Sequence, residues 1–220
     1  MQLSPAYPVL TPRLVLRPLV AADVEELLDY RARPEVCRYL PFAPMTREVL
    51  QARLAGDMGR TAITQEGQAV TLGAWAKDSG RLLGDVVLFF HSREHASGEI
   101  GYVFPDAGGR GYATEACTAV LALAFNELGL HRVTARMDSR NQASARLAGR
   151  LGLRQEAHFV RYQMFKGESS DELVFAMLAE EWPGSAADRT LSGLTLKFVG
   201  VMRRPRWPSA RGRRGEPGGR

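Results

Sequence analysis

Residues 98–116 combine a strand, a glycine-rich turn and the start of a helix, and this combination constrains the fold more than any other part of the chain. The apolar run 100–104 predicts a strand, which Pro105 ends. Apolar residues at helical spacing then predict a helix over about 114–128. The exposed N–H groups and the dipole at the start of such a helix favour an anion, so the turn is a candidate pyrophosphate site. Three glycines in the turn can adopt backbone conformations that a Cβ would forbid: Gly108, Gly109 and Gly111.

Hydrophobic patterns along the rest of the chain predict further strands and helices. Leu14 and Leu16 alternate with Arg13 and Arg17, as in a strand with one buried face. Asp23 can cap the helix that follows this strand. The full set of expected elements is strand 11–19, helices from 23 and over 46–58, strands 61–63, 70–77 and 82–90, the central strand and helix, strand 131–138, helix 141–151, and a closing hairpin of 159–165 with 172–178.

The composition changes after Trp182. Residues 183–220 are rich in proline, glycine and arginine, and nine basic and two acidic residues give them a net charge of +7. The chain carries +5, so residues 1–182 carry −2. We therefore expect one folded domain over residues 1–182 and a basic, largely disordered tail over 183–220. The tail leaves open a weak contact with RNA or a ribosome; a solvated chain end is the alternative.

Two other interpretations of the glycine turn do not involve an acyl-CoA. In a dinucleotide-binding fold, Gly109 and Gly111 would form part of the phosphate fingerprint and Asp138 would end the next strand. However, the third glycine position of that fingerprint is Thr114, and several strands precede the crossover. A glycine-rich connection that binds nothing is the second alternative.

The wider pattern resembles the GNAT acetyltransferase superfamily. Its [Gln/Arg]-x-x-Gly-x-[Gly/Ala] loop falls on 108–113, where Gly108 replaces the usual Gln or Arg. The segments TPRLVLRPL and GYATEA are similar to the Rim-type branch, as is Asn141-x-x-Ser144 before a helix that ends in Leu-Gly-Leu. That branch acetylates N-terminal amines of ribosomal proteins. The resemblance spans about residues 9–182.

The resemblance implies an α/β (α+β) fold: a mixed, largely antiparallel sheet that is splayed at its central strand and has helices on both faces. It also implies acetyl-CoA as co-substrate. The open edge of the central strand would pair with the amide-rich pantetheine arm, and the glycine turn would hold the pyrophosphate. The implied CoA-binding residues are Tyr102, Val103, Phe104, Gly108, Gly109, Arg110, Gly111, Tyr112, Ala113, Thr114, Asn141 and Ser144.

Acetyl transfer to an amine requires a base and benefits from a proton donor for the leaving thiolate. The resemblance places Glu99 as the base, acting through water, and Ser144 as the donor. Glu99 can instead be a solvent-facing strand residue, and Ser144 can merely help to cap the helix that Asn141 begins. Tyr39 and Phe42 are expected to border the acceptor, or else to belong to the core.

The leading acceptor is a protein N-terminal α-amine. An antibiotic, a polyamine or another small amine is the alternative, and a non-catalytic acyl-CoA- or RNA-binding protein is the alternative from another class. The four histidines lack metal-ligand spacing, so we expect no metal. The N-terminal residues show no signal-peptide pattern and no apolar run is long enough for a membrane span, so we expect a cytoplasmic monomer or homodimer without a membrane contact.

Overall fold

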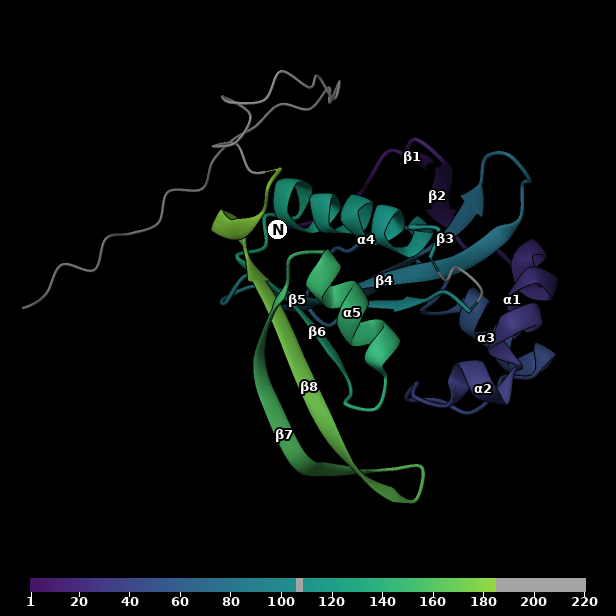
Figure 1. Cartoon of the computed structure of the whole chain (residues 1–220). Helices are drawn as coiled ribbons and strands as arrows, with labels where there is room; N and C mark the ends of the chain where they lie inside the picture. The colour runs from purple at the N-terminus through teal and green to yellow at the C-terminus, as the bar shows by residue number, and fades with distance from the viewer. Residues whose placement is uncertain (106–108, 185–220) are drawn as a thin grey trace, which may run out of the picture.

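The computed structural model describes residues 1–105 and 109–184 (Figure 1). Gly108 and residues 185–220, which make up most of the predicted tail, lie outside the described residues. The elements are β1 (Val9–Leu10), β2 (Leu14–Pro18), η1 (Ala21–Asp23), α1 (Val24–Arg31), α2 (Pro34–Cys37), α3 (Arg47–Ala55), β3 (Ala69–Ala76), β4 (Leu82–Ser92), β5 (Ser97–Val103), α4 (Tyr112–Ala122), η2 (Leu123–Glu127), β6 (Arg132–Asp138), α5 (Gln142–Arg150), β7 (Arg154–Phe165), β8 (Glu168–Leu178) and η3 (Ala179–Glu181).

The strands form one eight-stranded sheet in the order β1-β2-β3-β4-β5-β6-β8-β7. Its strand pairs are antiparallel except for β5 with β6, which is parallel. A parallel pair needs a crossover connection, and α4 supplies it between these two strands. The prediction of a mixed, largely antiparallel sheet is therefore confirmed.

The sheet splits between β5 and β6. Their pairing is confined to Ser97–Glu99 of β5, and it ends where Glu99 lies opposite Thr134. Beyond that point β5 continues to Val103, still paired with β4 on its other side. The remainder of β5 therefore has a free edge on the side of β6, and the predicted splay at the central strand is confirmed.

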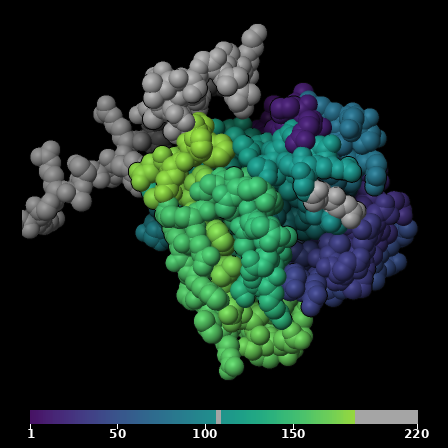
Figure 2. Space-filling view, viewed as in Figure 1, coloured from purple at the N-terminus to yellow at the C-terminus, as the bar shows by residue number. Residues whose placement is uncertain are grey.

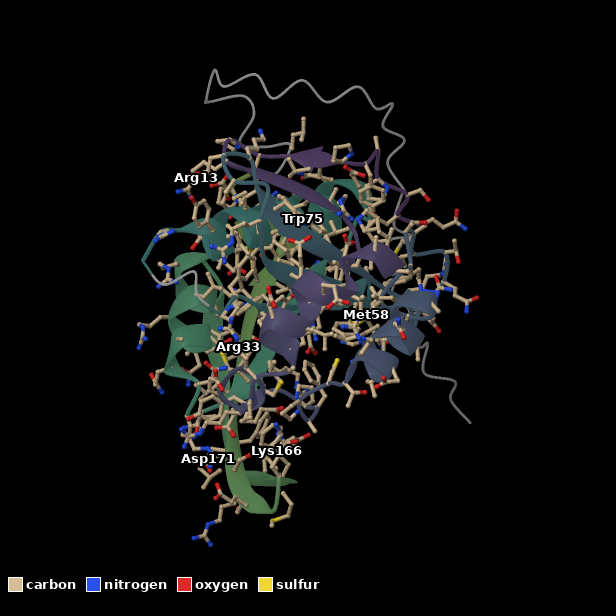
Figure 3. The ribbon with its side chains drawn as sticks, turned by 90° about the vertical axis from the view of Figure 1, so that its right-hand side faces the viewer. Arg13, Arg33, Met58, Trp75, Lys166 and Asp171 are labelled. Atoms are coloured by element: carbon tan, nitrogen blue, oxygen red, sulfur yellow. The ribbon has the colours of Figure 1, made fainter. Side chains whose placement is uncertain are left out.

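Helices cover both faces of the sheet, as predicted. On one face, α4 and α5 pack on a large apolar cluster that includes Leu72 and Ile100 (Figure 1). On the other face, α1 and α3 pack on a smaller cluster around Trp75, which Figure 3 labels. Side chains alternate between the faces of a strand, which is why neighbouring residues of β3 such as Ala74 and Trp75 belong to different clusters.

The observed elements differ from the sequence prediction in several places. The short β1 and α2 were not predicted. The predicted strand 61–63 is reduced to one bridge between Leu3 and Ile63. The central helix begins at Tyr112, two residues early, and its last turn is the π-helical η2. The closing hairpin is much longer than predicted, because the polar segment from Arg154 pairs along β8. That segment is largely exposed, so it carries little of the alternation that marks a half-buried strand.

No helix among the described residues is long and apolar enough to cross a membrane. Within the same residues, no group of three or more His, Cys, Asp or Glu side chains is arranged to hold a metal ion.

Candidate active site

A cleft of about 830 Å³ lies at the split in the sheet. The end of β5, the glycine turn with the start of α4, and one side of α5 form its walls, and α2 with the following connector borders it as well. In the space-filling view, α5 and the β7–β8 hairpin (green) meet the α1–α3 segment (purple to blue) along one seam (Figure 2). The predicted site residues that line the cleft are Tyr39, Tyr102, Val103, Phe104, Gly109, Gly111, Ala113, Thr114, Asn141 and Ser144.

The glycine turn leads into a helix start that has no side-chain cap. Gly111 is the N-cap of α4, with a φ of +76°, and as a glycine it has no side chain to cap the first turn. Gly109 also has a positive φ, of +79°. The first N–H groups of an α-helix have no partner within the helix, and here Ala113 and Thr114 of that turn line the cleft. The local geometry therefore suits an anion.

Another part of the lining consists of Tyr102–Phe104, at the free edge of the sheet. Because β6 has turned away here, the backbone groups on this edge of β5 are not used in pairing with β6. An amide-rich chain can add to such an edge as an extra strand.

Asn141, Ser144 and Tyr102 form a hydrogen-bonded group on the α5 side of the cleft. The side-chain oxygen of Asn141 accepts from the backbone N–H of Ser144 and so caps α5. The Ser144 hydroxyl donates to the Tyr102 hydroxyl at 3.2 Å, and Tyr102 in turn donates to the Ser144 carbonyl at 3.0 Å. Burial raises the pKa of Tyr102 to about 12. Its hydroxyl therefore remains a neutral donor at physiological pH.

The side-chain role of Tyr102 was missed by the sequence analysis, which assigned this residue only to the strand edge. A signal was present: Tyr102 lies two residues after Ile100, so both side chains point to the same face. Ile100 is a core residue on the face that α4 and α5 cover. Tyr102 is consequently directed toward α5.

The predicted role of Ser144 as proton donor implies that Tyr102→Phe reduces kcat more than it raises KM for the acyl donor, because Ser144 loses its hydroxyl partner while the edge of β5 is unchanged. A loss of about tenfold is expected for one hydrogen bond. Since the hydroxyl stays protonated up to a pKa of about 12, the ratio of mutant to wild-type kcat should stay constant from pH 7 to 9. Steady-state kinetics over that range test this, and a ratio that changes with pH would contradict it.

Glu99 lies at the apex of the split and does not line the cleft described above. Its carboxylate is 3.3 Å from Nε2 of His91, which is stacked on Phe89 of the same strand β4. The Glu99 side chain is 24% exposed, so solvent can reach its carboxylate while His91 remains in contact with it. On its other side is the positive charge of Arg136, which is paired with Glu172. A second cavity of about 550 Å³, lined by His91, His95 and His131 among others, opens next to this pair.

Three other predicted site residues do not line the cleft. Phe42 packs against the cluster around α1 and α3, where the guanidinium of Arg31 lies over its ring. Arg110 is exposed, and the contact that involves it is through its carbonyl. The ring of Tyr112 lies under the guanidinium of Arg13.

The tip of the β7–β8 hairpin is fastened to the connector that borders the cleft. Nζ of Lys166, labelled in Figure 3, donates to the carbonyls of Cys37 and Phe42 at 2.5 and 3.0 Å. From the loop before α5, Arg140 joins Asp138 to Glu168 of the same hairpin. The two Lys166 contacts join segments more than a hundred residues apart, and the sequence offers no signal for them.

Comparisons with known proteins point to one family. Residues 13–154 match the family model for the acetyltransferase (GNAT) domain. The uncharacterized N-acetyltransferase YnaD of Bacillus subtilis is 33% identical over 175 residues, which cover 79% of this chain and 98% of the relative. The ribosomal protein uS5-alanine N-acetyltransferase of Escherichia coli is 27% identical over 190 residues, which cover 82% of this chain and 95% of the relative.

Solved structures agree with the sequence comparisons. The crystal structure of a GNAT-family acetyltransferase from Bacillus anthracis matches with a TM-score of 0.70 at 29% identity, covering 78% of this chain and 98% of that structure. The family model spans more than half of the chain, and YnaD is matched over nearly its whole length. The chain therefore belongs to the GNAT acetyltransferase family and is an acyltransferase.

Proposed function

We propose that this protein transfers the acetyl group of acetyl-CoA to the N-terminal α-amine of a protein. The observation that carries the donor assignment is the pairing of an uncapped helix start with a free strand edge across one cleft. The first suits a pyrophosphate and the second suits the amides of pantetheine. The pyrophosphate and the pantetheine arm are present in every acyl-CoA, whatever its acyl group.

The reaction is a direct transfer in a ternary complex. The amine nitrogen attacks the thioester carbonyl; the C–N bond forms, the C–S bond breaks, and the amine loses a proton. In the proposal, Glu99 accepts that proton through water at the apex of the split, while the group of Tyr102 and Ser144 supplies a proton to the departing thiolate. A thiol has a pKa of about 8.5 by analogy with cysteine, so protonation assists its departure near neutral pH.

The acceptor assignment rests on the amine chemistry and on the shape of the entrance. An α-amine has a pKa near 8 and a lysine near 10.4, so at pH 7 the neutral fraction of the α-amine is about two orders of magnitude larger. The entrance is bordered by Tyr39 and Leu40, and Lys166 ties the same connector to the hairpin. Such a bounded entrance favours a chain end over a side chain on a rigid surface. The likeness to the uS5-alanine N-acetyltransferase supports the same acceptor.

Thiol release from acetyl-CoA tests the proposal. Three acceptors of matched concentration are compared at pH 7: peptides with a free N-terminus, the same peptides with a blocked N-terminus and an internal lysine, and spermidine. We expect acetyl-CoA to raise the melting temperature and the free N-terminus to give the highest kcat/KM, with mass spectrometry placing the acetyl group on the α-nitrogen.

Other results would separate the alternatives. A higher kcat/KM for spermidine than for every peptide would overturn the protein acceptor and favour a small-molecule amine. A thermal shift without turnover on any acceptor would favour a non-catalytic acyl-CoA-binding protein. The absence of a shift at millimolar acetyl-CoA would remove the donor assignment.

A further inference from the structure

Arg13, in the turn between β1 and β2, contacts the glycine turn and the start of α4. Its Nη1 donates to the carbonyl of Arg110 at 2.8 Å, and its Nε donates to the Glu115 carboxylate at 2.7 Å. The guanidinium lies 4.5 Å from the ring centroid of Tyr112. Nη2 is close to Gly111, since a Cβ built on that glycine would be 3.4 Å from it. One side chain thus contacts Arg110, Tyr112 and Glu115, and it lies next to Gly111.

The Glu115 carboxylate explains why a positive charge is needed at this position. Its carboxylate lies in the first turn of α4 and Glu115 lines the same cleft as the uncapped N–H groups. Partial burial would raise its pKa, but hydrogen bonds from Thr11 and Arg13 outweigh this and hold the pKa below its usual value. A fixed negative charge at this position would repel a pyrophosphate at the same helix start. The positive charge of Arg13 offsets it, and the bonds turn both carboxylate oxygens toward the β1–β2 turn.

We propose that Arg13 is a positioning residue for the acyl donor: it holds the turn 109–112 in the shape that receives the CoA pyrophosphate and neutralises the Glu115 carboxylate beside it. The proposal rests on the proposed use of acetyl-CoA. It assigns a role to a residue from the turn between β1 and β2, about a hundred positions away in the sequence from the turn it shapes. In Figure 3, Arg13 lies near the top of the view and Lys166, which contacts the connector beside the cleft, lies near the bottom.

Two acyl donors distinguish positioning from a general contribution to stability. Acetyl-CoA carries the pyrophosphate, whereas S-acetylpantetheine has the same thioester and pantetheine arm without it. The kcat/KM of Arg13→Gln is measured with both donors and one acceptor peptide. Arg81→Gln, which removes an exposed arginine from another turn of the same sheet, is the matched control. Melting temperatures establish that each variant is folded.

We expect Arg13→Gln to raise KM for acetyl-CoA about tenfold, the effect of losing a charge-assisted hydrogen bond. The kcat with acetyl-CoA and the kcat/KM with S-acetylpantetheine should stay within about twofold of wild type. In Arg13→Gln/Glu115→Gln, part of the affinity should return, because the unpaired carboxylate is gone. Calorimetric titration with CoA and with pantetheine gives the same comparison without turnover.

An equal loss with both donors would overturn the positioning role and leave a structural tie between the turn and α4. An unchanged KM for acetyl-CoA would also overturn it. If the wild-type protein neither binds CoA nor releases thiol, the proposed function itself fails and this inference fails with it. If the wild-type enzyme is active but Arg13→Gln loses the same fraction of kcat/KM with both donors, only the role of Arg13 is refuted.

Discussion

Glu99→Gln is expected to lower kcat about 100-fold at pH 7 with little change in KM for acetyl-CoA, because glutamine keeps the shape of the side chain but cannot accept a proton. Glu99 lies outside the donor cleft, at the point where β5 and β6 separate, so donor binding should be preserved. The polar side chains that face it are the imidazole of His91 on β4 and the guanidinium of Arg136 on β6. The measurement is kcat as a function of pH.

The loss should be greatest at low pH and smaller near pH 9. At low pH the acceptor is an ammonium ion, and a base is needed to free the nucleophile; above the pKa of the amine, near 8, most of it is already neutral. Glu180→Gln is the matched control, because it makes the same chemical change on an exposed residue of η3 that lines neither cavity. If the pH profile of Glu99→Gln has the wild-type shape, Glu99 is not the base.

Asp85→Ala is expected to lower the free energy of unfolding by about 3–5 kcal/mol, because it leaves a buried arginine without its counter-charge. Asp85 on β4 is 1% exposed and accepts hydrogen bonds from Tyr30 and Arg31, each at 2.5 Å. The Arg31 side chain is 6% exposed, and its Nε has no hydrogen-bond partner within the described part of the chain. Desolvation alone would lower the pKa of Arg31, but Asp85 and Tyr30 outweigh it and raise it. The guanidinium therefore stays charged, and removing Asp85 exposes the full cost of burying it.

Urea denaturation measures this effect. Asp57→Ala is the matched control: it removes the partner of Arg53 in an exposed ion pair, whose loss should cost no more than about 0.5 kcal/mol. The double variant Asp85→Ala/Arg31→Met should recover most of the stability, because the unpaired charge is then absent. A single Asp85→Ala variant that unfolds at the wild-type urea concentration would contradict the argument. Asp85 also lies opposite Val103, which lines the cleft, in the register of β4 and β5.

Local sequence patterns predicted much of the fold because each pattern reflects the backbone conformation that a short segment prefers. The strand that ends at Pro105, the glycine turn and the amphipathic helix follow one another within a short segment, and each has its own residue signature. The long β7–β8 hairpin was underestimated because the early part of β7 is an exposed edge strand with little alternation. What makes it a strand is its partner β8, which a local window does not contain.

The candidate site was predictable where its residues are local and less so where they are not. Gly111, Ala113 and Ser144 were found because turn chemistry and the family resemblance both mark them, and they line the cleft. Phe42 was expected beside the acceptor, yet it packs under Arg31. Aromatic residues in a connector follow no helical or strand periodicity, so the sequence does not indicate which part of the protein they pack against.

By itself, the sequence determined the strand–turn–helix unit, the succession of elements around it and the resemblance to an acyl-CoA-dependent family. Tertiary structure alone decided which distant side chains complete that unit. Arg13 reaches the turn, His91 reaches Glu99, and Lys166 joins the hairpin to the connector. The physical reason is that backbone conformation is set largely by neighbours in the chain, whereas charge pairing and hydrogen bonding between side chains depend on which strands the sheet brings together.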